Sequence, residues 1–339
     1  MRRRAMYDLV TFGEMLLRLA PPKFQRIEQA NHFTIGVTGA EMNACVAATR
    51  FGLKTAHVTR LPKNPLGRMI ENRIREHGID TSHIVWSEND RVGLFFLEAG
   101  ALPRTHAVLY DRKNSAMSKI HPGEVDWDAV FEKTKLFHVS GTAPALSKSS
   151  LEATKEALGQ AKKKGVKVSF DLNYRAKLWS EEEAQKTISP LMDCCNILIT
   201  TEEDTYRVFK IKEDDYKRVA EKLQERFDFD VVVITLRENI TVWRNNWTAV
   251  AYANGRFYDD VTYELEVVDR VGGGDAFTGG FLYAYLTFDR DIKKCLQYGN
   301  ASSALKHSIP GDLNWSTLKE VENLIRRGPG DGMKLRITR

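Results

Sequence analysis

The sequence has no long hydrophobic run and few cysteines. Nowhere do about eighteen apolar residues follow one another, so we expect no membrane-spanning helix and no membrane partner. Charged residues soon interrupt the apolar stretch that follows the basic residues 1–4, which argues against a secretory signal peptide. The four cysteines show no CxxC spacing, so neither a disulfide framework nor a zinc knuckle is expected. We therefore expect a reducing, cytoplasmic environment.

The sequence also lacks a strong excess of charge of either sign. Its 50 basic and 45 acidic residues leave a net charge of +5 over 339 residues, and the two kinds are interspersed. Bulk charge therefore gives no support for a nucleic-acid partner. The hydrophobic fraction of 42% is ordinary for a globular protein, which excludes wholesale disorder.

The common nucleotide and metal motifs are missing. The glycine-rich segment near residue 272 is not GxGxxG, because Phe277 stands at the third glycine position. GxxxxGK[ST] and HExxH do not occur. A dinucleotide-dependent dehydrogenase, a Walker-type ATPase and a zinc protease of that type thus lose their main support.

Short β-branched runs alternate with longer helical patterns along most of the chain. Strands are expected at 55–59, 136–140, 166–171, 197–201 and 231–235. Helices are expected at 40–51, 67–77, 149–164, 181–194, 216–227, 276–287 and 291–307. This alternation predicts an α/β fold, with a mostly parallel sheet flanked by helices on both faces. Ligands of such sheets bind at the carboxyl ends of the strands.

Two segments, 21–38 and 91–119, break this alternation and read as strands joined by turns. They predict a small antiparallel sheet projecting from a main domain formed by residues 6–20, 39–90 and 120–339. The range 6–20 would hold the first strand of that domain. The small sheet would be a lid that closes over a substrate, or equally an edge extension or a dimer interface. A homo-oligomer formed through this sheet is compatible with the pattern.

Residues 271–281 contain the sharpest feature of the sequence, three glycines that lead into an apolar helix. Gly272, Gly273 and Gly274 permit a tight turn with inward-facing amides, and a helix beginning near Asp275 would add its positive end. Such a point binds phosphate groups. An acidic residue there is explained if Asp275 accepts a hydroxyl proton beside a phosphoryl group in transit. The alternative is that Asp275 only caps the helix.

Residues 269–277 resemble the C-terminal signature of the ribokinase-like (PfkB) carbohydrate kinases, which is close to DTTGAGDAF. The likeness covers nearly the whole chain: 38–44 is similar to the family's GG..N.A substrate segment, 171–175 to its DxNxR strand end, and 299–304 to the helix beside its nucleotide pocket. The resemblance implies a ribokinase-like fold with a small antiparallel β lid. It also implies phosphorylation of a sugar by ATP with Mg²⁺, with the ATP site within 120–339.

Further segments resemble the 2-keto-3-deoxygluconate kinase branch of that family. They are the GE pair in 13–16, YxR at 110–112 followed by SA, and KHxxPGD at 306–312. The substrate would then be a sugar acid whose carboxylate is held by the planar guanidinium of Arg112, unless Arg112 is a solvated strand end. Phosphorylation of a neutral sugar, as by a fructokinase or ribokinase, is the near alternative. A non-catalytic, sugar-responsive binding protein is the alternative from another class.

The resemblance implies a role for each of a set of residues. Those expected are Asp275 with the amides of Gly272, Gly273 and Gly274 for catalysis; Gly39, Asn43, Phe95, Tyr110, Arg112, Arg175, Asp275 and Asp312 for the substrate; Asn173, Arg175, Thr235, Gly272, Gly274 and Asn300 for ATP; and Asp204, through water, for Mg²⁺.

The chain departs from the family pattern at several of these points. Arg270 stands where the signature has threonine, and Gly273 where it has alanine, which would make the turn more flexible. Thr201 and Asp204 replace the asparagine and glutamate of the family's NxxE segment, which weakens the expected metal site, although Mg²⁺ keeps several waters. Phe95 replaces a tyrosine that is frequent in the keto-deoxy-acid branch, which would remove one hydroxyl contact.

Overall fold

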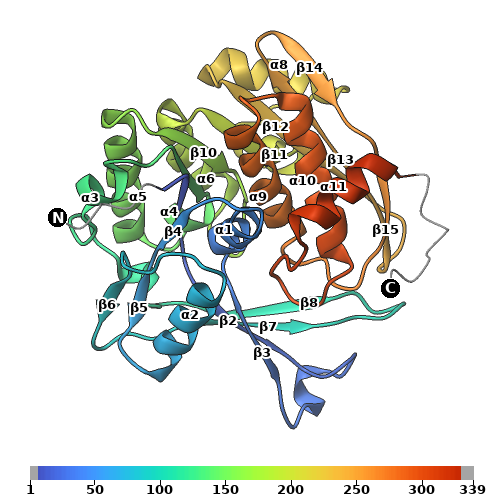
Figure 1. The fold of residues 1–339 in the computed structure, drawn as a ribbon. Helices are drawn as coiled ribbons and strands as arrows, with labels where there is room; N and C mark the ends of the chain where they lie inside the picture. Colours follow the sequence, from blue (N-terminus) through green and yellow to red (C-terminus); the bar gives the residue numbers. More distant parts are fainter. Residues whose placement is uncertain (1–6, 330–339) are drawn as a thin grey trace.

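A large sheet forms the centre of the molecule (Figure 1) in the computed structural model, which describes residues 7–329. Its strands are β1 (Leu9–Phe12), β4 (Thr55–Val58), β9 (Leu136–Ser140), β10 (Lys167–Asp171), β11 (Ile197–Thr201), β12 (Val231–Asn239), β13 (Arg244–Ala253), β14 (Arg256–Asp259) and β15 (Tyr263–Glu266). They follow the order β14-β13-β12-β11-β10-β9-β1-β4, with β15 paired to β13. All pairings from β12 to β4 are parallel, and those of β13 are antiparallel. The predicted mostly parallel sheet is confirmed.

Helices cover both faces of this sheet because its strands are apolar on both sides. Val232 and Ile234 of β12 point into one core, whereas Val231 and Val233 point into another, as the two-residue period of a strand requires. The first core takes side chains from α3 (Trp127–Phe131), α5 (Lys148–Lys163), α6 (Glu181–Ile188), α7 (Glu202–Phe209) and α8 (Tyr216–Phe227). The second takes side chains from α1 (Ala40–Arg50), α9 (Gly273–Thr287), α10 (Ile292–His307) and α11 (Leu318–Arg327).

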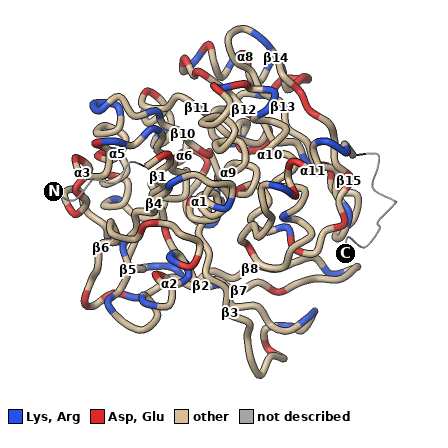
Figure 2. Tube along the Cα trace, in the orientation of Figure 1, with Lys and Arg blue, Asp and Glu red and all other residues tan. Residues whose placement is uncertain are grey.

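The remaining elements are small. Helix α2 (Pro65–Glu76) packs over a two-stranded sheet of β5 (Arg60–Pro62) and β6 (Val85–Ser87), and α4 (Thr142–Ala145) is a single turn after β9. Among the described residues, no helix has the length and apolar character needed to cross a membrane. Basic and acidic residues alternate along the trace without a tract of one sign (Figure 2).

A second sheet of four strands projects below the main body (Figure 1). Its order is β3 (Thr34–Thr38), β2 (Leu16–Ala20), β7 (Gly93–Glu98), β8 (Ala107–Asp111). Two of its pairings are antiparallel, as expected for the lid, and the β2–β7 pairing is parallel.

The lid begins earlier than the sequence indicated. Residues 16–20 were placed in the main domain, but they form the lid strand β2, and the expected lid range 21–38 contains a 3₁₀ turn (Ile27–Gln29) before its one strand. Leu16 and Leu17 pack in different core clusters on opposite faces of β2, so this strand begins without the polar alternation that marks the other lid segments. Residue 6 and residues 330–339 of the expected main-domain ranges, like residues 1–4, lie outside the described residues.

Two predicted helix limits also changed. The helix expected at 181–194 ends at Ile188 and continues as a 3₁₀ turn (Ser189–Cys194), because Pro190 has no amide hydrogen to donate. Helix α9 begins at Gly273, before the expected start near Asp275. Asp275 therefore lies within the first turn and is not the N-cap.

Helices α1 and α9 pack unusually closely, and a glycine makes this contact possible. A Cβ atom on Gly279 would lie 2.4 Å from the carbonyl oxygen of Ala44 and 2.6 Å from Cβ of Ala47. These distances are shorter than van der Waals contact, so any side chain at 279 would push the two helices apart. The contact brings the N-terminal turns of both helices together.

A pair of glycine substitutions tests this packing. We expect Gly279→Ala to lower the free energy of unfolding by about 1–3 kcal/mol through overpacking. Gly159→Ala is the matched control, because Gly159 lies within α5 with open space around it. We expect this substitution to raise the free energy of unfolding by roughly 0.5–1 kcal/mol. Urea unfolding measures both, and equal effects of the two substitutions would contradict the proposed contact.

Candidate active site

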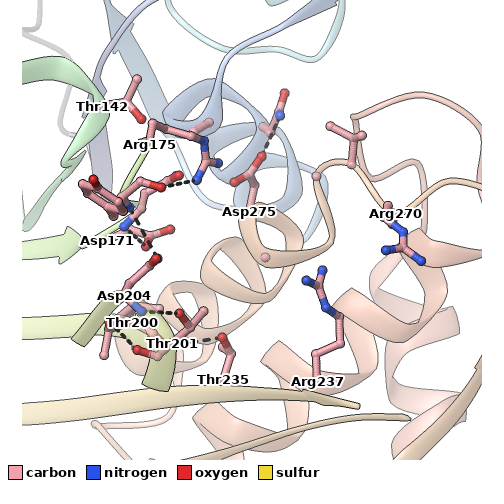
Figure 3. A pocket seen from close by; sticks show the side chains of 18 of the residues that line it. Thr142, Asp171, Arg175, Thr200, Thr201, Asp204, Thr235, Arg237, Arg270 and Asp275 are labelled. Carbon is pink, nitrogen blue, oxygen red and sulfur yellow. Dashed lines mark hydrogen bonds between the residues drawn. The ribbon is translucent and has the colours of Figure 1, made fainter. Parts of the chain in front are cut away.

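A cavity of about 910 Å³ opens at the carboxyl ends of the parallel strands (Figure 3). Its walls come from the ends of β10, β11 and β12, the first turns of α1, α7 and α9, and the lid strands β7 and β8. The lining includes most of the residues that the sequence singled out: Gly39, Asn43, Phe95, Tyr110, Arg112, Asn173, Arg175, Asp204, Thr235, Gly272, Gly274, Asp275 and Asp312. Segments far apart in sequence thus meet at one point, as the sheet topology predicts.

Asp275 lies where α9 meets α1. The N-cap of α9 is Gly272, which offers no side-chain cap, while the Asp275 carboxylate accepts a hydrogen bond from Asn43 Nδ2 at 2.7 Å. Burial raises the pKa of Asp275 to about 7, and the nearby charges of Asp312 and Glu41 act in the same direction. Asn43 and Arg175 oppose this rise. The carboxylate is therefore suited to gain or lose a proton near neutral pH.

The glycine turn presents open backbone to the cavity. Gly272 has a φ of 81° and lies against Asp312, whose carbonyl oxygen would be 1.9 Å from any Cβ at 272. Gly274 has open space beside it and lines the cavity, and the first-turn amides of α9 have no carbonyl partner within the helix. Together with the helix dipole they form an anion-binding point.

Gly273 differs from its two neighbours. Its α-carbon packs against the ring of His307, and its amide donates to the carbonyl oxygen of Arg270 at 3.3 Å. It is the first residue of α9 and is absent from the cavity lining. A Cβ at 273 would lie 2.3 Å from His307 Cε1, so the alanine of the family signature would not fit here unless that ring moved.

Acidic side chains gather on one side of Asp275. Asp171 ends β10, Asp204 lies in the first turn of α7, and Glu41 accepts from the amide of Ser140 at 3.1 Å. Burial raises the pKa of all three carboxyls, and the charges of Asp275 and Asp204 raise the pKa of Asp171 further. A cation placed here would relieve this repulsion.

The acidic side fits a hydrated magnesium ion better than a directly bound one. Within residues 7–329, no three His, Cys, Asp or Glu side chains are arranged to hold a metal ion. Asp171 and Asp204 offer carboxylate oxygens, and Asn173 Oδ1 is buried without a hydrogen-bond partner in the described part of the chain. Mg²⁺ commonly uses one or two carboxylates and keeps several waters. Thr201 caps α7 by accepting from the amide of Asp204 at 3.0 Å, which fixes Asp204 in the first turn of that helix.

A buried ionic cluster supports the glycine turn from below. Arg18 of lid strand β2 donates to Asp269 Oδ2 at 2.7 Å and also pairs with Asp312. Lys306 is fully buried, and its Nζ donates to the carbonyl oxygens of Asp269 at 2.9 Å and Ile309 at 3.3 Å. These contacts join the segment before the turn to the loop that contains Asp312. The second Asp312 oxygen is buried with no partner among the described residues, so it remains available to a ligand.

At the lid end, Arg112 is already paired. Its Nε donates to Glu14 Oε2 at 2.7 Å, and its guanidinium lies 5.5 Å from the ring centre of Tyr110. Glu14 is almost fully buried and also accepts from Ser115. Glu14 takes one edge of the guanidinium, and the other edge still carries donors for a carboxylate. Phe95 lies 5.9 Å from Tyr110, between ring centres, and lines the same wall.

Of the residues expected to bind the nucleotide, Asn300 is the exception. Thr235 lines the cavity at the end of β12, but Asn300 is fully buried outside the lining. Its amide group accepts from Trp247 Nε1 at 3.2 Å and donates to Asp260 Oδ2 at 3.0 Å. The expected direct contact is not supported, because Trp247 stands between Asn300 and the cavity.

The structure adds residues to which the sequence reasoning gave no role. They are Glu14, Arg18, Thr142, Asp171, Arg237 and Lys306. Glu14, Asp171 and Lys306 stand in the segments that carried the resemblance, and Arg237 lies just after a predicted strand. Arg18 carries no such signal, because its partners Asp269 and Asp312 lie far away in the sequence.

Comparison with known proteins extends over nearly the whole chain. A family model described as pfkB family carbohydrate kinase matches residues 6–317. The chain is 38% identical over 321 residues to the 2-dehydro-3-deoxygalactonokinase of Haloferax volcanii, which covers 95% of this chain and 97% of that protein. It is 29% identical to the 2-dehydro-3-deoxygluconokinase of Thermoproteus tenax, over 95% of each chain.

A solved structure agrees with these sequence matches. The crystal structure of 2-dehydro-3-deoxygluconokinase from Thermotoga maritima has a TM-score of 0.92 with this chain. The two are 39% identical, and the match covers 95% of this chain and 99% of that one.

The raised pKa of Asp275 has a consequence for stability. The folded protein keeps a proton on this carboxyl up to pH about 7, whereas the ordinary value is 3.8, so the folded state binds more protons than the unfolded state between these values. Stability contributed by this group therefore falls as the pH rises through that window. We expect Asp275→Asn to raise the melting temperature at about pH 8 and to have little effect near pH 4.

Asp214→Asn is the control, because Asp214 is exposed and lies outside the cavity. Thermal unfolding at a series of pH values measures both variants. A gain in melting temperature for Asp275→Asn that is the same at every pH would contradict the assigned pKa.

Proposed function

Since this chain belongs to the pfkB family of carbohydrate kinases, we propose that it transfers the terminal phosphoryl group of ATP to the 6-hydroxyl of 2-keto-3-deoxygluconate. The keto-deoxy sugar acids named for its relatives, where the prefix "2-dehydro" denotes the same keto group, support this substrate class. The observation that carries the proposal is the position of Asp275. A carboxylate with a pKa near neutrality stands beside the open amides of an anion-binding turn.

In the proposed mechanism, Asp275 accepts the proton of the substrate hydroxyl as its oxygen attacks the phosphorus. Asn43 fixes the orientation of the carboxylate through its hydrogen bond of 2.7 Å. The amides at Gly272 and Gly274 face the phosphoryl group and stabilise the negative charge on its oxygens. The bond from phosphorus to the bridging oxygen of ADP breaks, and ADP leaves with the electron pair.

Arg175 lies between the two halves of the reaction. Its positive charge acts on Asp275, Asp204 and Asp171. We place it against the substrate and the transferring phosphoryl group. Asp171 and Asp204, with the unpaired oxygen of Asn173, would hold a hydrated Mg²⁺, which neutralises phosphate charge when bound.

The lid end of the cavity receives the sugar acid. The free edge of Arg112 grips the carboxylate, while Glu14 holds the other edge and fixes the plane of the guanidinium. Gly39, Asn43 and the free oxygen of Asp312 would meet the hydroxyl groups. The galactonate epimer is the second candidate substrate, which the name of the Haloferax relative favours.

We expect the protein to act in the cytoplasm. Its four cysteines form no disulfide in the structure and would stay reduced there.

Kinetics test the role of Asp275. We expect Asp275→Asn to lower kcat by about 10²–10⁴ while the KM of the sugar acid changes little, since Asn keeps the shape but cannot accept the proton. In the wild-type enzyme, kcat/KM should rise about tenfold per pH unit and level off near the pKa of about 7. Full turnover by the asparagine variant would exclude Asp275 as the base.

A panel of acceptors tests the substrate. ATP consumption would be followed with 2-keto-3-deoxygluconate, its galactonate epimer, fructose and ribose. We expect the highest kcat/KM with one of the two keto-deoxy acids. Preference for fructose or ribose would favour the neutral-sugar alternative, and binding of a sugar acid without any turnover would favour a sensor.

The carboxylate grip needs a double substitution, because Arg112→Ala alone would leave the buried Glu14 unpaired. We expect Glu14→Gln with Arg112→Met to raise the KM of the sugar acid roughly 10–100-fold without changing the KM of ATP. Arg91→Gln, which breaks an exposed ion pair with Asp111 nearby, is the control. An unchanged KM of the sugar acid in the double variant would remove Arg112 from the substrate site.

A further inference from the structure

Two arginines face the cavity on the side of Asp275 opposite the acidic cluster. Arg237 extends from the end of β12, and Arg270 lies two residues before Gly272. In Figure 3 their guanidinium groups lie on one side of Asp275, and Asp171 and Asp204 lie on the other. The positive charge of Arg237 acts on Arg270, and both act on His307 beneath the turn, so the two side chains are neighbours.

Neither arginine forms an ion pair within residues 7–329. The ordered contact of Arg270 is a hydrogen bond from Nη2 to the carbonyl oxygen of Val242 at 2.9 Å, and its Nε is buried without a partner there. The nearest acid along the chain, Asp269, is held by Arg18 and by the amide of Gly311. Burial lowers the pKa of Arg270, the charge of Arg237 lowers it further, and the charge of Asp269 opposes both effects. Two like charges thus share one wall, and within the described residues neither is held in a direct ion pair.

Arg237 is exposed and Arg270 is half-buried, so both guanidinium groups can reach an anion in the cavity. A guanidinium group can donate two parallel hydrogen bonds to the oxygens of one phosphate group. Two neighbouring phosphate groups of a polyphosphate could therefore bind to the two arginines, one to each. The sugar-acid carboxylate is not the favoured occupant, because Arg112 already serves it at the lid end. The anion-binding amides of Gly272 and Gly274 follow Arg270 after a single residue and line the same cavity as both arginines.

We propose that Arg237 and Arg270 form a clamp for the polyphosphate chain of the phosphoryl donor. The inference rests on the proposed function and deepens it, since it assigns the grip on the donor to two specific side chains. At position 270 the clamp departs from the PfkB signature, which has threonine there. The cavity thus has a basic side at the two arginines and an acidic side at Asp171 and Asp204 (Figure 3).

Inorganic tripolyphosphate is the direct probe, because it carries the phosphate chain without nucleoside or sugar. We expect calorimetric titration to show binding to the wild-type protein, and about tenfold weaker binding for each of Arg237→Gln and Arg270→Gln. The double variant should bind tripolyphosphate roughly 100-fold more weakly than the wild-type protein. Higher salt should weaken the binding of tripolyphosphate to the wild-type protein more than to the variants. Arg237→Lys and Arg270→Lys should recover part of the loss, because they keep the charge but not the fork.

Arg244→Gln is the matched control, since Arg244 is exposed on the next strand and lies outside the cavity lining. We expect it to leave tripolyphosphate binding unchanged. The clamp variants should keep or raise the melting temperature, because they break no ion pair and relieve a repulsion. A fall in melting temperature that parallels the loss of binding would indicate a structural role and overturn the clamp.

Steady-state kinetics separate the clamp from the proposed function. We expect the KM of ATP to rise about as much as tripolyphosphate binding weakens, with the KM of the sugar acid unchanged. If the wild-type enzyme phosphorylates the sugar acid but Arg237→Gln/Arg270→Gln retains its KM of ATP and its tripolyphosphate affinity, the clamp is wrong and the function stands. If no sugar is phosphorylated but tripolyphosphate binding still depends on both arginines, the function fails and the clamp stands.

Discussion

The close contact between α1 and α9 is the constraint on which the site depends. Gly279 lets the helices approach until Asn43 of one reaches Asp275 of the other at 2.7 Å. Asp275 is half-buried at the cavity wall, and burial raises the pKa of its carboxyl to about 7. The same helix start supplies the open amides. Packing between two helices thus produces both the proton acceptor and the anion-binding point of the proposed reaction.

The surrounding charges divide the cavity along its length. Carboxylates crowd one side of Asp275, and two arginines without an ion pair in residues 7–329 occupy the other (Figure 3). Both arrangements are unfavourable in isolation, which is typical of a site that gives up stability in order to bind charged ligands. Arg18 connects this region to the lid, because it reaches from β2 to Asp269 and Asp312 beside the glycine turn. These ion pairs would therefore transmit a movement of the lid to the glycine turn.

Sequence periodicity predicted the parallel sheet. The resemblance to the PfkB segments predicted site residues of which most line the cavity, because the strand ends bring those segments together. The start of the lid differs from the prediction, since Leu16 and Leu17 make β2 apolar on both faces, as in a strand of the main sheet. The pairing of Arg112 with Glu14 joins residues 98 positions apart, and Asn300 is separated from the cavity by Trp247. Such relations arise from tertiary packing and leave no periodic signal in the chain.

The central claim is that the folded protein holds the carboxyl of Asp275 near its point of half-protonation at neutral pH. The most direct measurement is an NMR titration of side-chain carboxyl carbons in protein labelled with ¹³C-aspartate, with Asp275→Asn to assign the signal. The account predicts a midpoint near pH 7 in the absence of ligands. A midpoint near the ordinary 3.8 would contradict it, because the carboxylate would then be an exposed group without the burial that the α1–α9 contact imposes.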